Sequence, residues 1–163
     1  MRRPFIAGNW KMNLDMASAV GLAEQVAVQA EKVDGVEMAV CPPSVYLQAV
    51  RKALDGSKVG LGAQNVYHEP KGAFTGEISI AMLRDLGCTY VILGHSERRH
   101  VLGETDEMIN KKVLVALEGG LLPIVCVGEL LAEREAGSTL DVIRCQIDGS
   151  LAGLDAERMR RTV

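Results

Sequence analysis

The sequence has no long apolar run, no cluster of basic residues and no closely spaced cysteines. Lys and Arg number 18 against 21 Asp and Glu, for a net charge of −3, and aromatic residues make up only 4% of the chain. No basic block is interleaved with aromatics, which argues against a nucleic-acid-binding surface. We therefore expect the partner to be a small molecule or another protein.

The apolar stretches are too short for a membrane protein. The longest, residues 121–127, falls far below the roughly 20 residues that span a bilayer. The first residues are basic, but Asn9 and Lys11 interrupt them before any apolar segment typical of a signal peptide. These features predict a cytoplasmic protein that binds neither membrane nor nucleic acid.

The four cysteines stand singly inside apolar runs, without CxxC spacing: Cys41, Cys88, Cys126 and Cys145. This pattern favours buried free thiols over a disulfide framework or a metal site. We expect no metal and no cofactor. With 163 residues, of which 48% are hydrophobic, the chain should form a single domain over residues 1–163 with a real core.

Short β-rich apolar runs alternate with longer helical patterns. The runs begin near residues 5, 36, 58, 90 and 122, a spacing of about 30 residues that is typical of a strand plus a crossover helix. We therefore expect an α/β fold with parallel strands, either doubly wound or a (β/α)8 barrel. The nearest approach to a dinucleotide fingerprint, residues 60–65, lacks its third glycine, so the barrel is favoured.

Helical spacing predicts two apolar stripes that face the core. They are formed by Ala19, Leu22, Val26 and Ala30 and by Leu140, Ile143, Ile147 and Leu151. Between them, Thr105 is predicted to cap a helix that ends at Gly119 and Gly120.

Polar residues collect where the predicted strands end: Asn9, Lys11, Gln64, Asn65, His95, Glu97 and Glu129. Sites on such folds lie at the carboxyl ends of the strands. By alternation, Asn9 and Lys11 share a face with Phe5 and Ala7, which would place an ammonium at the top of an apolar column, where it can meet an anion.

Five motifs in this order resemble the triosephosphate isomerase family over essentially the whole chain. They are GNWKMN at 8–13, GAQNVY at 62–67, GAFTGEIS at 72–79, VILGHSERR at 91–99 and IVCVGE at 124–129. The resemblance implies a TIM barrel and an intramolecular aldose–ketose isomerase. It also implies a cytoplasmic homodimer of glycolysis and gluconeogenesis that acts on triose phosphate.

The resemblance further implies a role for each matching residue. Asn9 and Lys11 would contact substrate, His95 would be a neutral electrophile as in the standard description of this enzyme, and Ser96 would start the turn that orients it. Glu97 would pair with Lys11, and Cys126 would be a buried residue supporting the site. The loop of Phe74, Thr75, Gly76 and Glu77 would dock into a second subunit.

Plainer interpretations of these residues exist. His95 and Glu97 could form a structural cap or ion pair, and Lys11 could be a snorkelling side chain. His68 and His100 match nothing catalytic and are predicted to lie on the surface. Only the joint match of several motifs favours a functional site over these interpretations.

The glutamate that serves the family as general base has no counterpart in this sequence. In the family it follows the sixth strand, and residues 155–163 fall where that strand would begin. We expect about five of eight βα units, an incomplete and open barrel, without the lid or the phosphate-binding turns. Glu97 is the nearest carboxylate, but the resemblance pairs it with Lys11.

Three interpretations therefore stand: a truncated N-terminal fragment without useful activity, a half-enzyme complemented by a C-terminal piece, and a self-associating α/β binding module. The first and fifth strands should be open edges, with interior side chains such as Ala7, Val40 and Leu93 uncovered. We expect weak or no binding of substrate, and self-association as a dimer or a larger oligomer.

Overall fold

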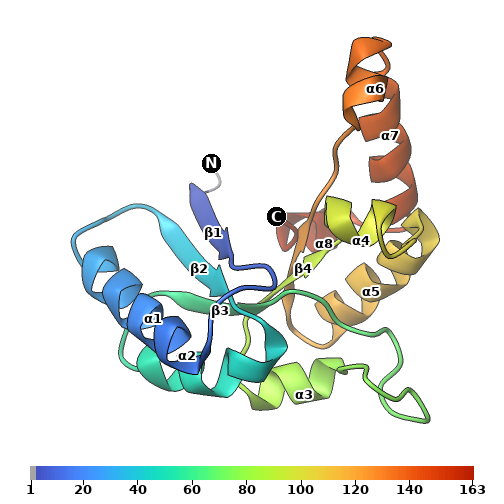
Figure 1. Ribbon diagram of the computed structural model, residues 1–163. Coiled ribbons are helices and arrows are strands. Elements are labelled where there is room, and N and C mark those ends of the chain that lie inside the picture. The colour runs from blue at the N-terminus through green and yellow to red at the C-terminus, as the bar shows by residue number, and fades with distance from the viewer. Residues whose placement is uncertain (1–2) are drawn as a thin grey trace.

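The computed structural model describes residues 3–163, which form a five-stranded parallel sheet in the order β1-β2-β3-β4-β5 (Figure 1). The strands are β1 (Phe5–Asn9), β2 (Glu37–Cys41), β3 (Gly60–Ala63), β4 (Tyr90–Leu93) and β5 (Leu122–Val125). Every predicted apolar run contains one of them. The sheet curls into an open half-barrel, as expected of about five βα units of a TIM barrel.

Helices follow the strands in alternation. They are α1 (Met16–Ala30), α2 (Leu47–Ala53), α3 (Ile80–Asp85), α4 (Ser96–His100), α5 (Asp106–Glu118), α6 (Leu131–Glu135), α7 (Thr139–Ser150) and α8 (Ala156–Arg160), with a 3-10 turn at Ser44–Tyr46 before α2. Figure 1 shows α6 and the start of α7 projecting away from the sheet as an arm. No helix within residues 3–163 is both long and apolar enough to span a bilayer.

The predicted boundaries of α5 are confirmed. The Thr105 side chain accepts a hydrogen bond from the backbone N–H of Met108, and the first turn is acidic. The helix ends at its C-cap Gly119, and Gly120 adopts a φ of 80°, a left-handed conformation that suits glycine.

The main core lies between the sheet and its helices, and it corrects part of the interior prediction. In the β1–β2 register Ala7 pairs with Ala39 and Gly8 pairs with Val40, so Val40 faces the opposite side from Ala7. Val40 and Leu93 are buried in the helix-facing cluster, not in the barrel interior. They are 3% and 0% exposed.

The inner face of the sheet is better covered than expected. The rings of Phe5 and Tyr90 lie 4.8 Å apart across it, and Ala39, Tyr90 and Ile92 are all buried. Curling brings these side chains together even without a closed barrel. The prediction that the interior would be laid open is therefore wrong for these positions.

The two edges of the sheet differ. The N–H of Val163 donates to the carbonyl of Pro123 at 2.9 Å, and the N–H of Val125 donates to the carbonyl of Val163 at 2.9 Å. Residue 163 thus pairs with β5 as the start of a further parallel strand would, and the β5 edge is partly covered. Within the part of the chain described, β1 pairs only with β2, and Ile6 is 62% exposed.

Both predicted apolar stripes are wrong in part. On α1, Ala19, Ala23 and Ala30 are buried and Leu22 is exposed, because the small alanines are the residues that pack against the core. Val26 is half-buried and packs against the core, as predicted, and together with the exposed Leu22 it borders an apolar groove that also includes Met38.

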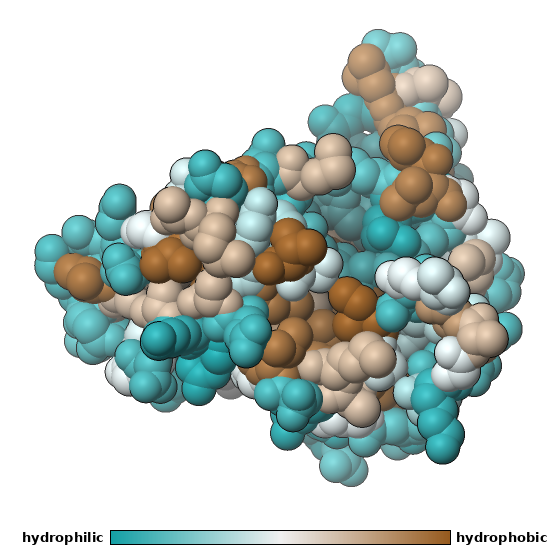
Figure 2. Space-filling view, turned by 60° about the horizontal axis from the view of Figure 1, so that its bottom comes forward, coloured by the Kyte–Doolittle hydropathy of each residue, from teal (hydrophilic) through white to brown (hydrophobic). Residues whose placement is uncertain are grey.

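On α7 the buried residues are Gln146 and Ser150, while Leu140 is 74% exposed and Ile147 is also exposed. The helix packs on α5 near its end, where Leu151 reaches the core as predicted and Ile143 is half-buried, and it carries the arm with Leu140 away from the sheet. In Figure 2 hydrophobic residues gather on this arm.

The cysteine prediction holds for two residues of four. Cys41 and Cys88 are buried, and burial raises their pKa to about 12 and about 11, so both thiols stay protonated. Cys126 is half-buried, and Cys145 is exposed on α7. All four are free thiols, and residues 3–163 hold no group of three or more His, Cys, Asp or Glu placed to bind a metal ion.

Candidate active site

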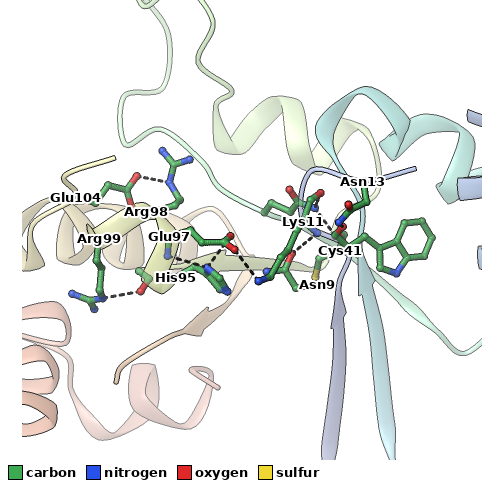
Figure 3. A network of polar contacts seen from close by, with 12 residues as sticks. Asn9, Lys11, Asn13, Cys41, His95, Glu97, Arg98, Arg99 and Glu104 are labelled. Carbon is green, nitrogen blue, oxygen red and sulfur yellow. Dashed lines mark hydrogen bonds and ion pairs between the residues drawn. The ribbon is translucent and has the colours of Figure 1, made fainter. Parts of the chain in front are cut away.

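A cleft of about 480 Å³ opens at the carboxyl ends of the strands. Polar residues at the end of β1 and in the segments after β1, β3 and β4 line it: Asn9, Lys11, Gln64, Asn65, His95 and Glu97. Three segments far apart in sequence therefore meet at one place, as the strand-end pattern predicted. Figure 3 shows Lys11 and His95 converging on Glu97.

Lys11 is held in an uncommon backbone conformation. Its φ is 52°, which costs an L-residue about 1–2 kcal/mol. Its N–H donates to Asn9 Oδ1 at 3.0 Å, and its carbonyl accepts from Gln64 Nε2 at 2.8 Å. Gln64 also donates to the Cys41 carbonyl at 2.9 Å, so β2 and the β3 loop together fix the lysine.

The His95 ring is the N-cap of α4. Its Nδ1 accepts a hydrogen bond from the backbone N–H of Glu97 at 3.3 Å. Nδ1 also lies 3.3 Å from Glu97 Oε2, a contact that would be an ion pair only if Nδ1 carried a proton. A backbone N–H can only donate, so the cap selects the neutral ring with its proton on Nε2. His95 therefore offers the cleft a neutral N–H donor.

Glu97 joins the two halves of the cleft. Its Oε1 lies 2.8 Å from Lys11 Nζ, and both side chains are half exposed. The hydrogen bond from Lys11 is the main cause that lowers the pKa of Glu97, and the charge of Lys11 adds a smaller contribution in the same direction. The carboxylate is thus ionised over the whole neutral range.

Replacing Lys11 with Met should raise the pKa of Glu97 toward that of an ordinary glutamate. A depressed pKa means that the ion pair persists above the folded-state pKa and is lost as the pH falls through it. A ¹³C carboxyl NMR titration of both proteins measures the change. Lys58→Met, which removes the partner of Asp34, is the matched control. An unchanged Glu97 titration in Lys11→Met would contradict the pairing.

Other predicted residues lie at the margin of the cleft or outside it. Ser96 is exposed and is the first residue of α4, as expected. Cys126 is half-buried rather than buried, and its carbonyl accepts from Arg99 at 3.1 Å. Glu129 Oε1 accepts a hydrogen bond from Arg134 Nε at 2.7 Å, and Glu129 does not line the cleft.

The remaining histidines lie away from the cleft. His100 is exposed, as predicted, whereas His68 is half-buried against the ring of Tyr67 at 4.5 Å. The surface prediction for His68 was therefore wrong, because the β3–α3 loop folds back on itself and its aromatic rings pack together.

A buried ionic network behind the cleft was not anticipated from the sequence. Glu104 Oε1 accepts hydrogen bonds from Arg98 Nε at 2.6 Å and from Lys112 Nζ at 2.5 Å. Lys112 also donates to Asn65 Oδ1 at 3.0 Å. Burial tends to raise the pKa of Glu104, but the two cations outweigh it and lower the pKa. Arg98 and Asn65 line the cleft, so the network fixes part of its wall.

The loop of Phe74, Thr75, Gly76 and Glu77 is exposed at the rim of the cleft. It is nevertheless ordered, because the Phe74 ring packs 4.8 Å from Tyr67 and the Glu77 N–H donates to the Phe74 carbonyl at 3.0 Å. Gly76 has a φ of 91°, which favours glycine.

Two carboxylates border the cleft within residues 3–163, namely Glu77 and Glu97. Glu97 is bound to Lys11, and Glu77 belongs to the exposed loop. The arrangement can therefore bind an anion and donate a hydrogen bond to it, but neither carboxylate is an evident general base.

Comparison with known proteins agrees with the motifs. The family model for triosephosphate isomerase matches residues 4–163. The triosephosphate isomerases of Herpetosiphon aurantiacus and Carboxydothermus hydrogenoformans are 52% and 54% identical over 163 and 158 residues, and that of Rhodopirellula baltica is 54% identical over 162. These matches cover 97–100% of this chain but 63–65% of each relative. The chain belongs to the triosephosphate isomerase family.

Proposed function

We propose that the chain carries the half of a triosephosphate isomerase site that binds the substrate anion and polarises its oxygens. The observation that carries this proposal is the convergence of Lys11, Glu97 and the neutral His95 ring on one cleft. Triosephosphate isomerase is itself the standard example of a neutral histidine electrophile working beside a glutamate base.

Each side chain has a distinct task in this proposal. The Nε2–H of His95 donates to the carbonyl and hydroxyl oxygens of the triose phosphate, where charge develops as an enediolate forms. The ammonium of Lys11 neutralises the phosphate and that developing charge. Asn9 holds the Lys11 backbone, Glu97 orients its ammonium, and Ser96 starts the turn behind His95. Cys126 supports the site from the end of β5, and no cofactor is needed.

The reaction also needs a base to remove a proton from the carbon beside the carbonyl. We propose that no residue of this chain does so and that the chain alone is inactive. The complete reaction belongs to glycolysis and gluconeogenesis in the cytoplasm. We propose the same pathways and the same compartment for this chain because its longer relatives are triosephosphate isomerases.

Triose phosphate should bind the isolated chain weakly and in a salt-dependent manner. The cleft offers one half-exposed ammonium, and such a charge is screened over about 10 Å at 0.1 M salt. A titration with dihydroxyacetone phosphate, followed by amide NMR, should shift Lys11 and His95 at millimolar concentration. Lys11→Met should abolish the shifts, and Lys58→Met should keep them. Micromolar affinity, or shifts that survive Lys11→Met, would contradict the proposal.

We also propose that the chain self-associates as a dimer or a larger oligomer. Two features support this: the ordered, exposed loop Phe74–Glu77 beside the cleft, and the free edge of β1 with the exposed Ile6. Loop insertion and edge pairing are the two modes of contact that these features allow.

Thr75→Arg should weaken the assembly if loop insertion dominates, because a charged side chain then enters the contact. Light scattering over a dilution series measures the dissociation, and Thr89→Arg, at an exposed threonine away from the loop, is the matched control. Thr75→Arg should leave assembly unchanged if edge pairing dominates, in which case Ile6→Lys should weaken it. A wild-type chain that stays monomeric at all concentrations rules out both modes.

A half-enzyme complemented by a second polypeptide is the alternative function. The pairing of Val163 with β5, the uncovered stripe of Leu140 and Ile147, and the groove beside Leu22 favour it, because each is a surface that further βα units would cover. The family membership leaves a binding module of another kind without support.

A further inference from the structure

The side chain of Arg99 connects four elements beneath the candidate site. It is 7% exposed and donates from Nε to the Gly94 carbonyl at 2.7 Å, and from Nη1 to Asp106 Oδ1 at 2.5 Å. Its Nη2 donates to the Cys126 carbonyl at 3.1 Å and to Ser150 Oγ at 3.0 Å. One guanidinium thus ties the ends of β4 and β5 to the start of α5 and the end of α7.

The bond to Gly94 is the one that concerns His95. The Gly94 carbonyl is part of the peptide group that joins Gly94 to His95. By binding this carbonyl, Arg99 fixes the orientation of the peptide group that precedes His95. Gly94 has a φ of 68°, and a Cβ there would lie 2.8 Å from Arg99 Nη2. The turn therefore requires glycine both for its left-handed backbone and for the close approach of the guanidinium.

The guanidinium itself has little freedom to move. Ser150 Oγ donates to Asp106 Oδ1 at 2.8 Å, and a Cβ on Gly149 would lie 2.7 Å from Asp106 Cβ, so α7 packs tightly against the acceptors of Arg99. Charge-assisted bonds in such a fixed fork are strong and directional.

We infer that Arg99 is a positioning residue for the His95 ring. By fixing the peptide before His95, it keeps the residue in the cap geometry in which Nδ1 accepts from Glu97 N–H and Nε2 keeps its proton. Arg99 touches no substrate and acts through His95. The catalytic meaning of this role rests on the proposed function, whereas the effect on the ring can be measured without activity.

Arg99→Lys, studied with ¹⁵N-labelled histidine, tests the inference. A lysine donates all its hydrogen bonds from one nitrogen and cannot reach four acceptors spread around a planar guanidinium, so the peptide group between Gly94 and His95 should no longer be held in one orientation. In the wild-type chain a long-range ¹H–¹⁵N spectrum should show His95 as a single Nε2–H tautomer, in which the ¹⁵N chemical shifts of the two ring nitrogens differ widely. In the variant that pattern should be lost, and the two nitrogen signals should move toward each other as both tautomers become populated.

Two further variants complete the set. Asp106→Asn keeps the size of one acceptor but removes its charge, and should shift the His95 nitrogens in the same direction by less. Arg98→Lys alters the neighbouring arginine, whose side chain binds Glu104, whereas its bond to the turn, to the His95 carbonyl, is made by the backbone N–H and is kept in the variant. It should leave the His95 pattern as in the wild type, and the exposed His100 is the internal reference in every spectrum.

The outcomes distinguish the positioning role of Arg99 from the proposed role of His95 as electrophile. A folded Arg99→Lys chain with the wild-type His95 pattern overturns the inference, as does an equal shift in Arg98→Lys. Should Arg99→Lys not fold, the Asp106→Asn result decides in the same way. A wild-type His95 that carries its proton on Nδ1 overturns the proposed electrophile instead, while a change of its ring signals in Arg99→Lys still supports the positioning role.

Discussion

The 163-residue chain alone is expected to interconvert glyceraldehyde 3-phosphate and dihydroxyacetone phosphate no faster than buffer. In the proposed function His95 and Lys11 stabilise charge on the substrate oxygens. Of the two carboxylates that border the cleft within residues 3–163, however, Glu97 is bound to Lys11 and Glu77 belongs to an exposed loop, so neither is positioned as the base. General-base catalysis is worth about 10²–10⁴-fold, and the complete enzyme works near the diffusional limit. The contribution of the general base should be missing.

A coupled assay measures the rate, and His95→Gln is the control that identifies contamination. Activity that is equal in the two preparations comes from a host enzyme. Turnover of the wild-type chain that disappears in His95→Gln would show that a base exists within the chain, and the proposed inactivity would be wrong.

Leu93→Ala is expected to destabilise the chain by about 2–5 kcal/mol, the usual cost of truncating a fully buried leucine. Leu93 is 0% exposed, lies in the helix-facing core and ends β4 two residues before His95. Leu140→Ala makes the same chemical change on α7, where the side chain is 74% exposed, and should alter stability by no more than about 0.5 kcal/mol.

Urea unfolding of both variants, compared at equal chain concentration, gives the two free energies. A loss at Leu140 as large as that at Leu93 would mean that the arm is covered in solution, and the description of its face as unpartnered would be wrong. A negligible loss at Leu93 would contradict the packed core behind the site.

The sequence predicted the strands and the strand-end polar residues well because both follow from local rules. Apolar runs about 30 residues apart become parallel strands, and the residues after them share one edge of the sheet. Lys11, His95 and Glu97 therefore lie in one cleft, as predicted. The side of the sheet that a strand residue faces depends on register, which explains the wrong placement of Val40 and Leu93.

Leu140 and Ile147 on α7 were wrongly predicted to face the core for a different reason. Helical periodicity shows that Leu140 and Ile147 share a face, but not whether another element covers it. The buried network of Glu104 and Lys112 had no signal of its own, because nothing in the sequence indicates that a glutamate before a helix and a lysine within it will be buried together. Only tertiary packing places both behind the cleft.

The most direct test of the central claim, that this chain carries the electrophilic half of an isomerase site, uses a chimera. The chain is joined at Val163 to the part of the Carboxydothermus hydrogenoformans triosephosphate isomerase that follows its match to this chain, and the rate is compared with that of its His95→Gln variant. We predict an active chimera that loses about 10²-fold or more of its activity on this substitution. A folded chimera that is inactive, or one whose activity is unchanged by His95→Gln, would contradict the claim.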